Sequence, residues 1–198
     1  MKKWLLSTGL TVMMPLMLVF FILVVMSGGA SGSTSGKGKV TPATPTATEA
    51  EFIERIAAGA KLTQNEYGVL ASVTMGQAIL ESGWGKSGLA IEGNNLFGVK
   101  ADSRWTGPTL EMRTTEEVDG GIISIMATWR AYNSWDDSVL DHGRFLKENS
   151  RYAEAGLFQA TDYRGQVQAL KNAGYATESD YVNLVCGVIE SYGLNKYD

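Results

Sequence analysis

The sequence predicts an α+β domain that is mostly helical, with one β-hairpin inserted after its second helix and a single apolar helix in front. Apolar residues recur at helical spacing over most of the chain beyond residue 48. A segment near the middle alternates with a period of two, and the first 26 residues are almost free of charge. Roughly 150 residues remain for folding, which is a normal size for one compact domain.

Residues 4–26 form an apolar stretch that follows Lys2 and Lys3. At 1.5 Å per residue the stretch gives about 35 Å of helix, which is enough to cross a hydrocarbon core of ~30 Å. The two lysines place the N-terminus in the cytoplasm and the rest of the chain outside. We therefore expect residues 1–26 to be a signal-anchor that holds the protein in the cell membrane. Cleavage of a signal peptide near Ala30, followed by secretion, is the alternative.

Residues 27–47 are expected to be a flexible linker. They consist of Gly, Ser, Thr, Pro and Ala with two lysines and one valine, which is too little apolar surface to build a core. The folded domain is therefore expected to span residues 48–198.

Two segments, residues 48–51 and 63–66, carry a capping box in which Thr is followed three positions later by Glu. Apolar residues follow each segment at helical spacing, so helices are expected to begin at Thr48 and Thr63. The second helix should run to about Ser82, where glycines end it. Glu81 then falls in the last turn of a largely buried helix.

A β-hairpin is expected in the middle of the domain. Residues 109–116 alternate, residues 119–121 are the turn signal Asp-Gly-Gly, and residues 122–132 are rich in β-branched and aromatic side chains. Helical patterns then return at residues 138–146, 166–173 and 181–192.

Charge and rare residues exclude several functions. Four of the 17 basic residues precede residue 48 and none of the 21 acidic ones does, so the domain carries 13 against 21, a formal charge of −8. That balance argues against nucleic-acid binding, which depends on neutralising phosphates.

The single cysteine and single histidine, Cys186 and His142, allow no zinc pairing, and no metal or other cofactor is expected. A papain-like peptidase built on this pair is disfavoured because Cys186 lies within a helix rather than at its start.

Glu81 is the strongest candidate for chemistry. It follows Ala-Ile-Leu and precedes Ser-Gly-Trp-Gly, and carboxylates are rarely buried without a partner. Apolar surroundings disfavour the charged form, raise the pKa and keep a carboxyl protonated near neutral pH. Glu81 is therefore expected to be a general acid.

Seven short motifs in order resemble the glucosaminidase domain of glycoside hydrolase family 73, which includes bacterial autolysins and the flagellar rod-cap muralytic enzyme. The motifs are residues 77–87, 95–100, 105–107, 114–116, 129–132, 151–152 and 174–177 with Tyr181. The resemblance covers about residues 65–193. It implies a lysozyme-like fold and hydrolysis of the β-1,4 bond after N-acetylglucosamine in peptidoglycan.

The resemblance also implies residue roles. Glu81 matches the acid of the family, and the second carboxylate falls on Glu116, with Glu117 as a near rival. Adjacent strand residues point to opposite faces, so only one of the two can face the cleft. We favour Glu116 because it directly follows a Thr-Thr pair. Tyr175 matches a tyrosine that lines the cleft of the family, where it could orient the acetamido group or an attacking water.

Two carboxylates suit glycoside hydrolysis, because one protonates the leaving oxygen and the other activates water or stabilises an oxocarbenium-like transition state. Attack by the N-acetyl group of the substrate is left open. The candidate substrate contacts are Trp84, Asn95, Phe97, Trp105, Tyr132 and Tyr152. Trp105, in a loop, is the better candidate for stacking on a sugar, whereas Trp84 and Phe97 also suit the core, as does Trp129. Asn95 is either a turn residue or a sugar ligand.

The expected partners are peptidoglycan glycan strands and, through the N-terminal helix, the membrane. Two alternatives stay open at this point. One is an N-acetylmuramidase of the same fold, which would cut the other glycosidic bond. The other is a non-catalytic peptidoglycan-binding module.

Overall fold

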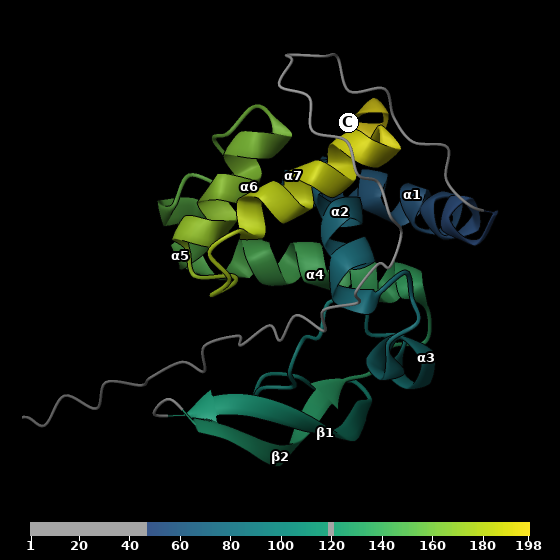
Figure 1. Ribbon diagram of the computed structural model, residues 1–198, viewed down its shortest axis with the longest axis vertical. Coiled ribbons are helices and arrows are strands. Elements are labelled where there is room, and N and C mark those ends of the chain that lie inside the picture. The colour runs from purple at the N-terminus through teal and green to yellow at the C-terminus, as the bar shows by residue number, and fades with distance from the viewer. Residues whose placement is uncertain (1–46, 119–120) are drawn as a thin grey trace, which may run out of the picture.

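Helix α2 (Ala71–Ser82) is the central element of the structure, a computed structural model that describes residues 47–118 and 121–198. Its residues 71–79 are all buried, so the helix is covered on every side. The covering elements are α1 (Ala47–Tyr67), α4 (Trp135–Glu148), α6 (Tyr163–Asn172) and α7 (Tyr181–Tyr192), as Figure 1 shows. The prediction of a mostly helical α+β domain is confirmed.

Three short helices were not expected from the sequence: α3 (Gly88–Gly93), α5 (Ser150–Glu154) and the 3₁₀ helix η1 (Leu194–Tyr197). Each is too short to show a helical repeat of apolar residues. Helix α3 nevertheless carries a local signal, because Ser87 Oγ accepts a hydrogen bond from Ala90 N at 3.2 Å and caps its first turn.

The prediction that the second helix begins at Thr63 is wrong. Helix α1 runs through Thr63 to Tyr67, and Gly68, with φ of +78°, then ends it. Thr63 is fully buried and its Oγ1 donates to the carbonyl of Val139 at 3.2 Å, so the hydroxyl contacts α4 and caps nothing. Thr63 thus belongs to the interface between α1 and α4.

Helix α2 begins instead at Ala71, and its first amides are capped by side chains from elsewhere in the fold. Gln166 Oε1 accepts from Leu70 N at 2.8 Å, and Gln64 Oε1 accepts from Ala71 N at 2.7 Å. Asp198 Oδ1 accepts from the next amide, that of Ser72, at 2.8 Å. These bonds satisfy amides that a helix leaves unpaired at its start.

The predicted hairpin is formed by β1 (Thr109–Val118) and β2 (Gly121–Arg130), which pair antiparallel from Thr109 opposite Arg130 to Val118 opposite Gly121. Two of the three expected turn residues, Asp119 and Gly120, lie outside the described residues, and the third, Gly121, begins β2. In Figure 1 the hairpin lies beside the helical body, past the end of α2 that carries Glu81.

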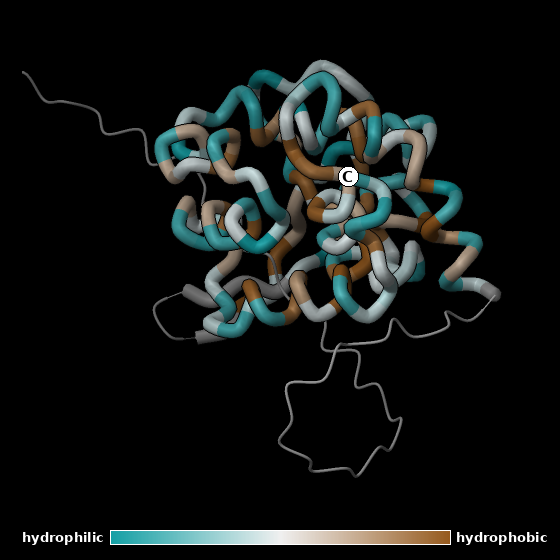
Figure 2. Tube along the Cα trace, turned by 90° about the horizontal axis from the view of Figure 1, so that it is seen from above, coloured by the Kyte–Doolittle hydropathy of each residue, from teal (hydrophilic) through white to brown (hydrophobic). Residues whose placement is uncertain are grey.

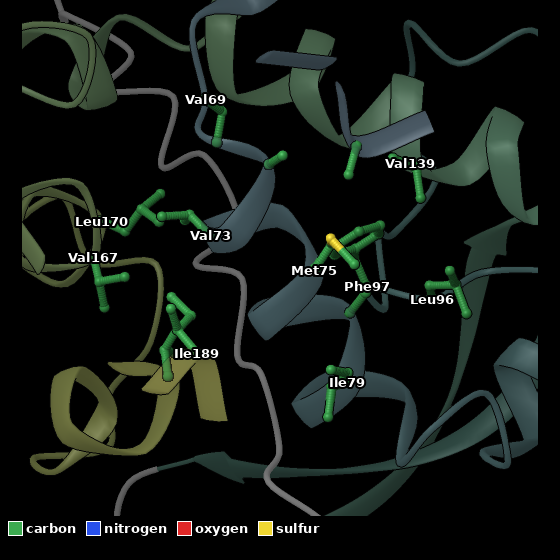
Figure 3. Close-up of a cluster of buried hydrophobic side chains, with 14 of the residues drawn as sticks. Val69, Val73, Met75, Ile79, Leu96, Phe97, Val139, Val167, Leu170 and Ile189 are labelled. Atoms are coloured by element: carbon green, nitrogen blue, oxygen red, sulfur yellow. The ribbon is translucent and has the colours of Figure 1, made fainter. Parts of the chain in front are cut away.

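The apolar residues gather in the interior of the helical body, where the tube in Figure 2 is brown, and polar residues cover the outside. Figure 3 shows α2 at the centre of this core. Val167, Leu170 and Ile189 from α6 and α7 lie on one side of it. Leu96, Phe97 and Val139 lie on the other, so α2 is held from both sides.

The predicted membrane segment, residues 1–26, and all but the last residue of the predicted linker lie outside the described residues. Within residues 47–118 and 121–198, no helix combines the length and the apolar character needed to cross a membrane.

Candidate active site

Glu81 occupies the last turn of α2 with its carboxyl turned into the protein. The residue keeps partial exposure, but its Oε1 atom is fully buried and has no hydrogen-bond partner among the described residues. Burial raises the pKa of this carboxyl from 4.5 to about 8, because a poorly solvated charge is disfavoured. Glu81 is therefore protonated at neutral pH while part of the residue stays accessible.

The chain turns sharply after Glu81. Ser82 Oγ donates to Ala78 O at 2.5 Å and accepts from Gly85 N at 2.7 Å, which closes the end of the helix. Gly83 and Gly85 have φ of +55° and +72°, a region that glycine enters without steric cost. The Ser-Gly-Trp-Gly sequence thus fixes the position at which the helix carrying Glu81 ends.

Trp84, between these glycines, is a non-glycine residue with φ of +64°. Such a conformation costs about 1–3 kcal/mol and persists only where surrounding contacts impose it. The Trp84 ring makes edge contacts with Tyr192 and Phe52, at centroid distances of 4.8 and 5.8 Å. Packing of the Trp84 ring therefore holds the turn that follows Glu81.

A set of buried rings, called here the aromatic cluster, adjoins Glu81. It consists of Phe97, His142, Tyr152, Tyr175 and Tyr181. Ring centroids of its contacting pairs lie 3.9 to 6.4 Å apart. Residues from the loops and from α4, α5 and α7 thus converge on one end of α2.

Two hydrogen bonds connect polar atoms within and beside the aromatic cluster. Gln77 Nε2 donates to Tyr181 Oη at 2.8 Å, and His142 Nε2 lies 3.2 Å from Tyr175 Oη. Burial lowers the pKa of His142 to about 3, so the imidazole is neutral. Burial is the main cause that raises the pKa of Tyr175 and of Tyr181 well above 10, and the charge of Glu81 is the second cause. Both phenols therefore keep their protons.

Strand β1 presents two alternating sets of side chains. The half-buried set is Leu110, Met112 and Thr114, and the exposed set is Thr109, Glu111 and Arg113. The first set faces the helical body, since Leu110 lies against Gly93 of α3. Glu116 and Glu117 follow in the same strand, opposite Ile123 and Ile122, and their side chains lie outside the part of the chain whose burial the structure describes.

The hairpin is joined to α4 by a buried ion cluster around Asp141. Arg130 Nη1 and Tyr132 Oη both donate to Asp141 Oδ2 at 2.8 Å, and Arg144 donates to Oδ1. Burial alone would raise the pKa of Asp141, but hydrogen bonds from these three residues outweigh it and lower the pKa. The Arg130 guanidinium also lies 4.7 Å from the Trp105 ring, so the cluster holds the loop before the hairpin.

Three predicted substrate contacts lie in the interior: Asn95, Phe97 and Tyr152 are at most 1% exposed. The Asn95 amide bonds the carbonyls of Val99 and Arg130 at 3.0 and 2.8 Å, so it is a turn residue rather than an available sugar ligand. Phe97 stacks on a histidine ring and Tyr152 packs within the aromatic cluster. In this conformation these side chains support the site and present no surface to a sugar.

The remaining predicted contacts differ in exposure. Trp84 and Trp105 are half-buried, and Tyr132 is 8% exposed and bonded to Asp141. The Trp105 indole packs edge-on against Tyr132 at 5.6 Å and its Nε1 donates to Pro108 O at 2.8 Å. These contacts hold the Trp105 indole in place in a loop beside the hairpin.

From the sequence, neither Gln77 nor His142 was assigned a role in the site. Gln77 had a detectable signal, because it lies four residues before Glu81 and so shares its helix face. His142 had none, since its neighbours Phe97 and Tyr175 are 45 and 33 positions away along the chain. Within the described residues, no group of three or more acidic, His or Cys side chains is placed to hold a metal ion.

The family model of the glucosaminidase domain, described as mannosyl-glycoprotein endo-beta-N-acetylglucosaminidase, matches residues 57–194. Curated relatives agree. The chain is 35% identical over 150 residues to the exo-glucosaminidase LytG of Bacillus subtilis, covering 74% of this chain and 52% of that one. It is 36% identical over 163 residues to the peptidoglycan hydrolase FlgJ of Salmonella typhimurium, covering 77% and 51%. The chain thus spans about half the length of these relatives.

Solved structures show the same similarity. The catalytic domain of the autolysin Auto from Listeria monocytogenes superposes with a TM-score of 0.70 at 31% identity, covering 79% of this chain and 90% of that one. A C-terminally truncated glycoside hydrolase domain of Salmonella typhimurium FlgJ superposes with a TM-score of 0.61 at 33% identity, covering 73% of this chain and 97% of that one.

Proposed function

This chain belongs to the glucosaminidase family, glycoside hydrolase family 73, and has its lysozyme-like fold; from that premise we propose that it cleaves the β-1,4 bond after N-acetylglucosamine in peptidoglycan. The relatives named as an exo-glucosaminidase and as peptidoglycan hydrolases support the substrate class. The alternatives are an N-acetylmuramidase of the same fold and a non-catalytic peptidoglycan-binding module, and the experiment below separates them from this proposal.

The observation that carries the proposal is the state of Glu81. Burial raises the pKa of its carboxyl to about 8, which keeps the proton at neutral pH, part of the residue is accessible, and Oε1 has no partner within the described part of the chain. A general acid needs a proton at working pH and a route to the leaving oxygen. Glu81 therefore transfers its proton to the glycosidic oxygen as the bond breaks, leaving a carboxylate and the free hydroxyl of the departing sugar.

Glu116 is our choice for the second carboxylate. Its position in β1 follows Leu110, Met112 and Thr114, the set that faces the helical body, whereas Glu117 follows the exposed set. A carboxylate on the inward face of the hairpin would activate water or stabilise the oxocarbenium-like transition state.

Tyr175 is assigned a role through Glu81 rather than a direct contact with sugar. Its side chain has no exposed surface, so it cannot reach an acetamido group or an attacking water in this conformation. The charge of Glu81 contributes, after burial, to the raised pKa of Tyr175, so we assign the role of Tyr175 to that carboxyl. Trp105, half-buried and braced in its loop, is our choice for stacking on a sugar ring.

We also propose that residues 1–26 anchor the protein in the cell membrane with the domain outside, linked by residues 27–47. The length of the apolar stretch and its two flanking lysines support this. Secretion after cleavage near Ala30 is the competing outcome.

Digestion of purified cell walls tests the function directly. We expect soluble muropeptides whose new reducing end, by mass spectrometry, is N-acetylglucosamine. A reducing-end N-acetylmuramic acid would make the protein a muramidase. Binding to walls without release of fragments would make it a non-catalytic module.

A further inference from the structure

His142 is held in one orientation by two rings of the aromatic cluster. Its imidazole stacks on Phe97 at a centroid distance of 3.9 Å with an interplanar angle of 5°. Its Nε2 lies 3.2 Å from Tyr175 Oη, and the Tyr175 ring stands at 88° to the imidazole. The residue has no exposed surface, so its ring nitrogens meet only protein.

The unpaired nitrogen of this ring indicates its tautomer. Nδ1 is buried and has no hydrogen-bond partner among the described residues. A neutral imidazole carries one N–H, and a hydrogen on Nδ1 would leave a buried donor unpaired. A hydrogen on Nε2 can be donated to Tyr175 Oη. Nδ1 is then an unpaired acceptor, which buried sites tolerate more often than an unpaired donor. His142 is therefore protonated on Nε2 and donates to Tyr175 Oη.

This tautomer leaves the proton of the Tyr175 hydroxyl available. Glu81 lies one helical turn after Gln77, whose Nε2 donates to Tyr181 Oη at 2.8 Å, and the Tyr181 ring lies 5.8 Å from the Tyr175 ring. After burial, the charge of Glu81 is also the largest contributor to the raised pKa of Tyr175. Tyr181 repeats the arrangement, because Gln77 Nε2 donates to its oxygen at 2.8 Å and Glu81 is again the charged neighbour. Each phenol oxygen is occupied by a donor, so each phenol proton is free to face Glu81.

We propose that His142 is a positioning residue that fixes the Tyr175 hydroxyl as a hydrogen-bond donor to the carboxylate that Glu81 becomes after protonating the leaving group. The inference rests on the proposed role of Glu81. No proton leaves Tyr175 or His142 in this step: Glu81 gives its proton to the glycosidic oxygen, and the tyrosine donates a hydrogen bond to the resulting anion. A hydrogen bond to a charged group is worth about 1.5–3 kcal/mol, or roughly 10–100-fold in rate.

Nuclear magnetic resonance tests the tautomer without any need for activity. The chain has one histidine, so ¹⁵N-labelled histidine in the full-length protein gives a single pair of ring signals. Long-range ¹H–¹⁵N correlations should show the neutral Nε2–H form from pH 8 to pH 5. An Nδ1–H form, which would take up the Tyr175 proton, would overturn the proposal.

Titration of ¹³C-labelled Glu81 tests the coupling, again without catalysis. The charge of Glu81 raises the pKa of Tyr175 and of Tyr181, and Asp141 is the charged neighbour of His142 on α4. Loss of a donor to the carboxylate should raise the Glu81 pKa in His142→Leu and in Tyr175→Phe. His142→Gln should restore the wild-type value, because its amide N–H can occupy the place of Nε2–H. An unchanged Glu81 pKa in both donor-loss variants would contradict the proposal.

Wall digestion then gives the kinetic consequence. We expect His142→Leu to lower kcat about tenfold or more with little change in KM, and to have no further effect in a Tyr175→Phe background. Additive losses would show that His142 acts by another route. Tyr163→Phe, which removes a hydroxyl that donates to Glu190 on the far α6–α7 contact, is the matched control and should leave kcat unchanged. If Glu81→Gln were fully active, the proposed function would fail while the two spectroscopic results would still stand.

Discussion

Arg130 Nη1 donates to Asp141 Oδ2 at 2.8 Å, and this buried ion pair joins the last residue of the hairpin to helix α4. The two side chains are 9% and 3% exposed, so neither charge has water as an alternative partner. The ion pair therefore ties the hairpin that carries Glu116 to the helical body that carries Glu81. Removal of either residue would leave the other charge buried without its main partner.

Replacing Asp141 with Asn should destabilise the protein by about 3 kcal/mol, because it removes the buried counter-charge of Arg130 and leaves only the more exposed Asp102, at 3.9 Å. Urea denaturation measures the loss. Arg144→Ala is the control: its side chain is 50% exposed and its removal leaves the buried pair intact, so we expect about 1 kcal/mol or less. Equal losses of stability in Asp141→Asn and Arg144→Ala would show that the buried ion pair contributes no more than the exposed one.

Glu81→Gln should nearly abolish wall hydrolysis while leaving the fold intact. The amide has the same shape but cannot donate the proton, and general acid catalysis is worth about 10²–10⁴-fold. Turbidity loss of purified walls gives the rate, and circular dichroism checks the fold. Residual activity above roughly a tenth of wild type would remove Glu81 from the role of acid.

Stability should respond to pH through the same carboxyl. The folded protein holds the Glu81 proton up to about pH 8, whereas the unfolded chain releases it near 4.5. Because the folded pKa is raised, the stabilisation is present below pH 4.5 and is lost as the pH rises through 8. Thermal melts should therefore show wild type losing stability relative to Glu81→Gln between these values. A constant difference across the range would indicate an unshifted pKa.

Activity should fall over the same alkaline range, because only protonated Glu81 can act as the acid. We expect kcat to decline as the pH rises through about 8. A decline centred near pH 4.5 would show that the carboxyl is solvated in the working enzyme.

Glu116→Gln should cost more wall-hydrolysing activity than Glu117→Gln, because the two residues belong to opposite faces of β1. Initial rates on purified walls decide the order. The reverse order would transfer the second role to Glu117. If neither substitution mattered, attack by the N-acetyl group of the substrate would be favoured.

The full-length protein should fractionate with membranes, because residues 4–26 are long enough to span one. Immunoblotting of membrane, wall and medium fractions tests this. A form shortened by about 30 residues in the medium would identify a cleaved signal peptide instead. A truncated protein that begins at Thr48 should digest isolated walls as well as the full chain does, since every proposed catalytic residue follows it.

Part of the site could be predicted because its signals are local. The hairpin is visible as alternation around an Asp-Gly-Gly turn, and Glu81 is placed at the end of a buried helix by the glycines that follow it. The choice of Glu116 over Glu117 starts from adjacent residues as well, and it stays a prediction. Periodicity and turn chemistry depend only on near neighbours, so one sequence suffices to read them.

The sequence by itself thus determined the α+β class, the hairpin and the placement of Glu81 in the last turn of a helix. Only the tertiary structure decided where that helix begins, because its first amides are capped by Gln166 and Asp198, which lie 96 and 126 residues away along the chain. It also buried Tyr175 behind Glu81 and supplied its partner His142 from another helix. Burial and long-range hydrogen bonds arise when distant segments pack together, and no local pattern of residues encodes which segments meet.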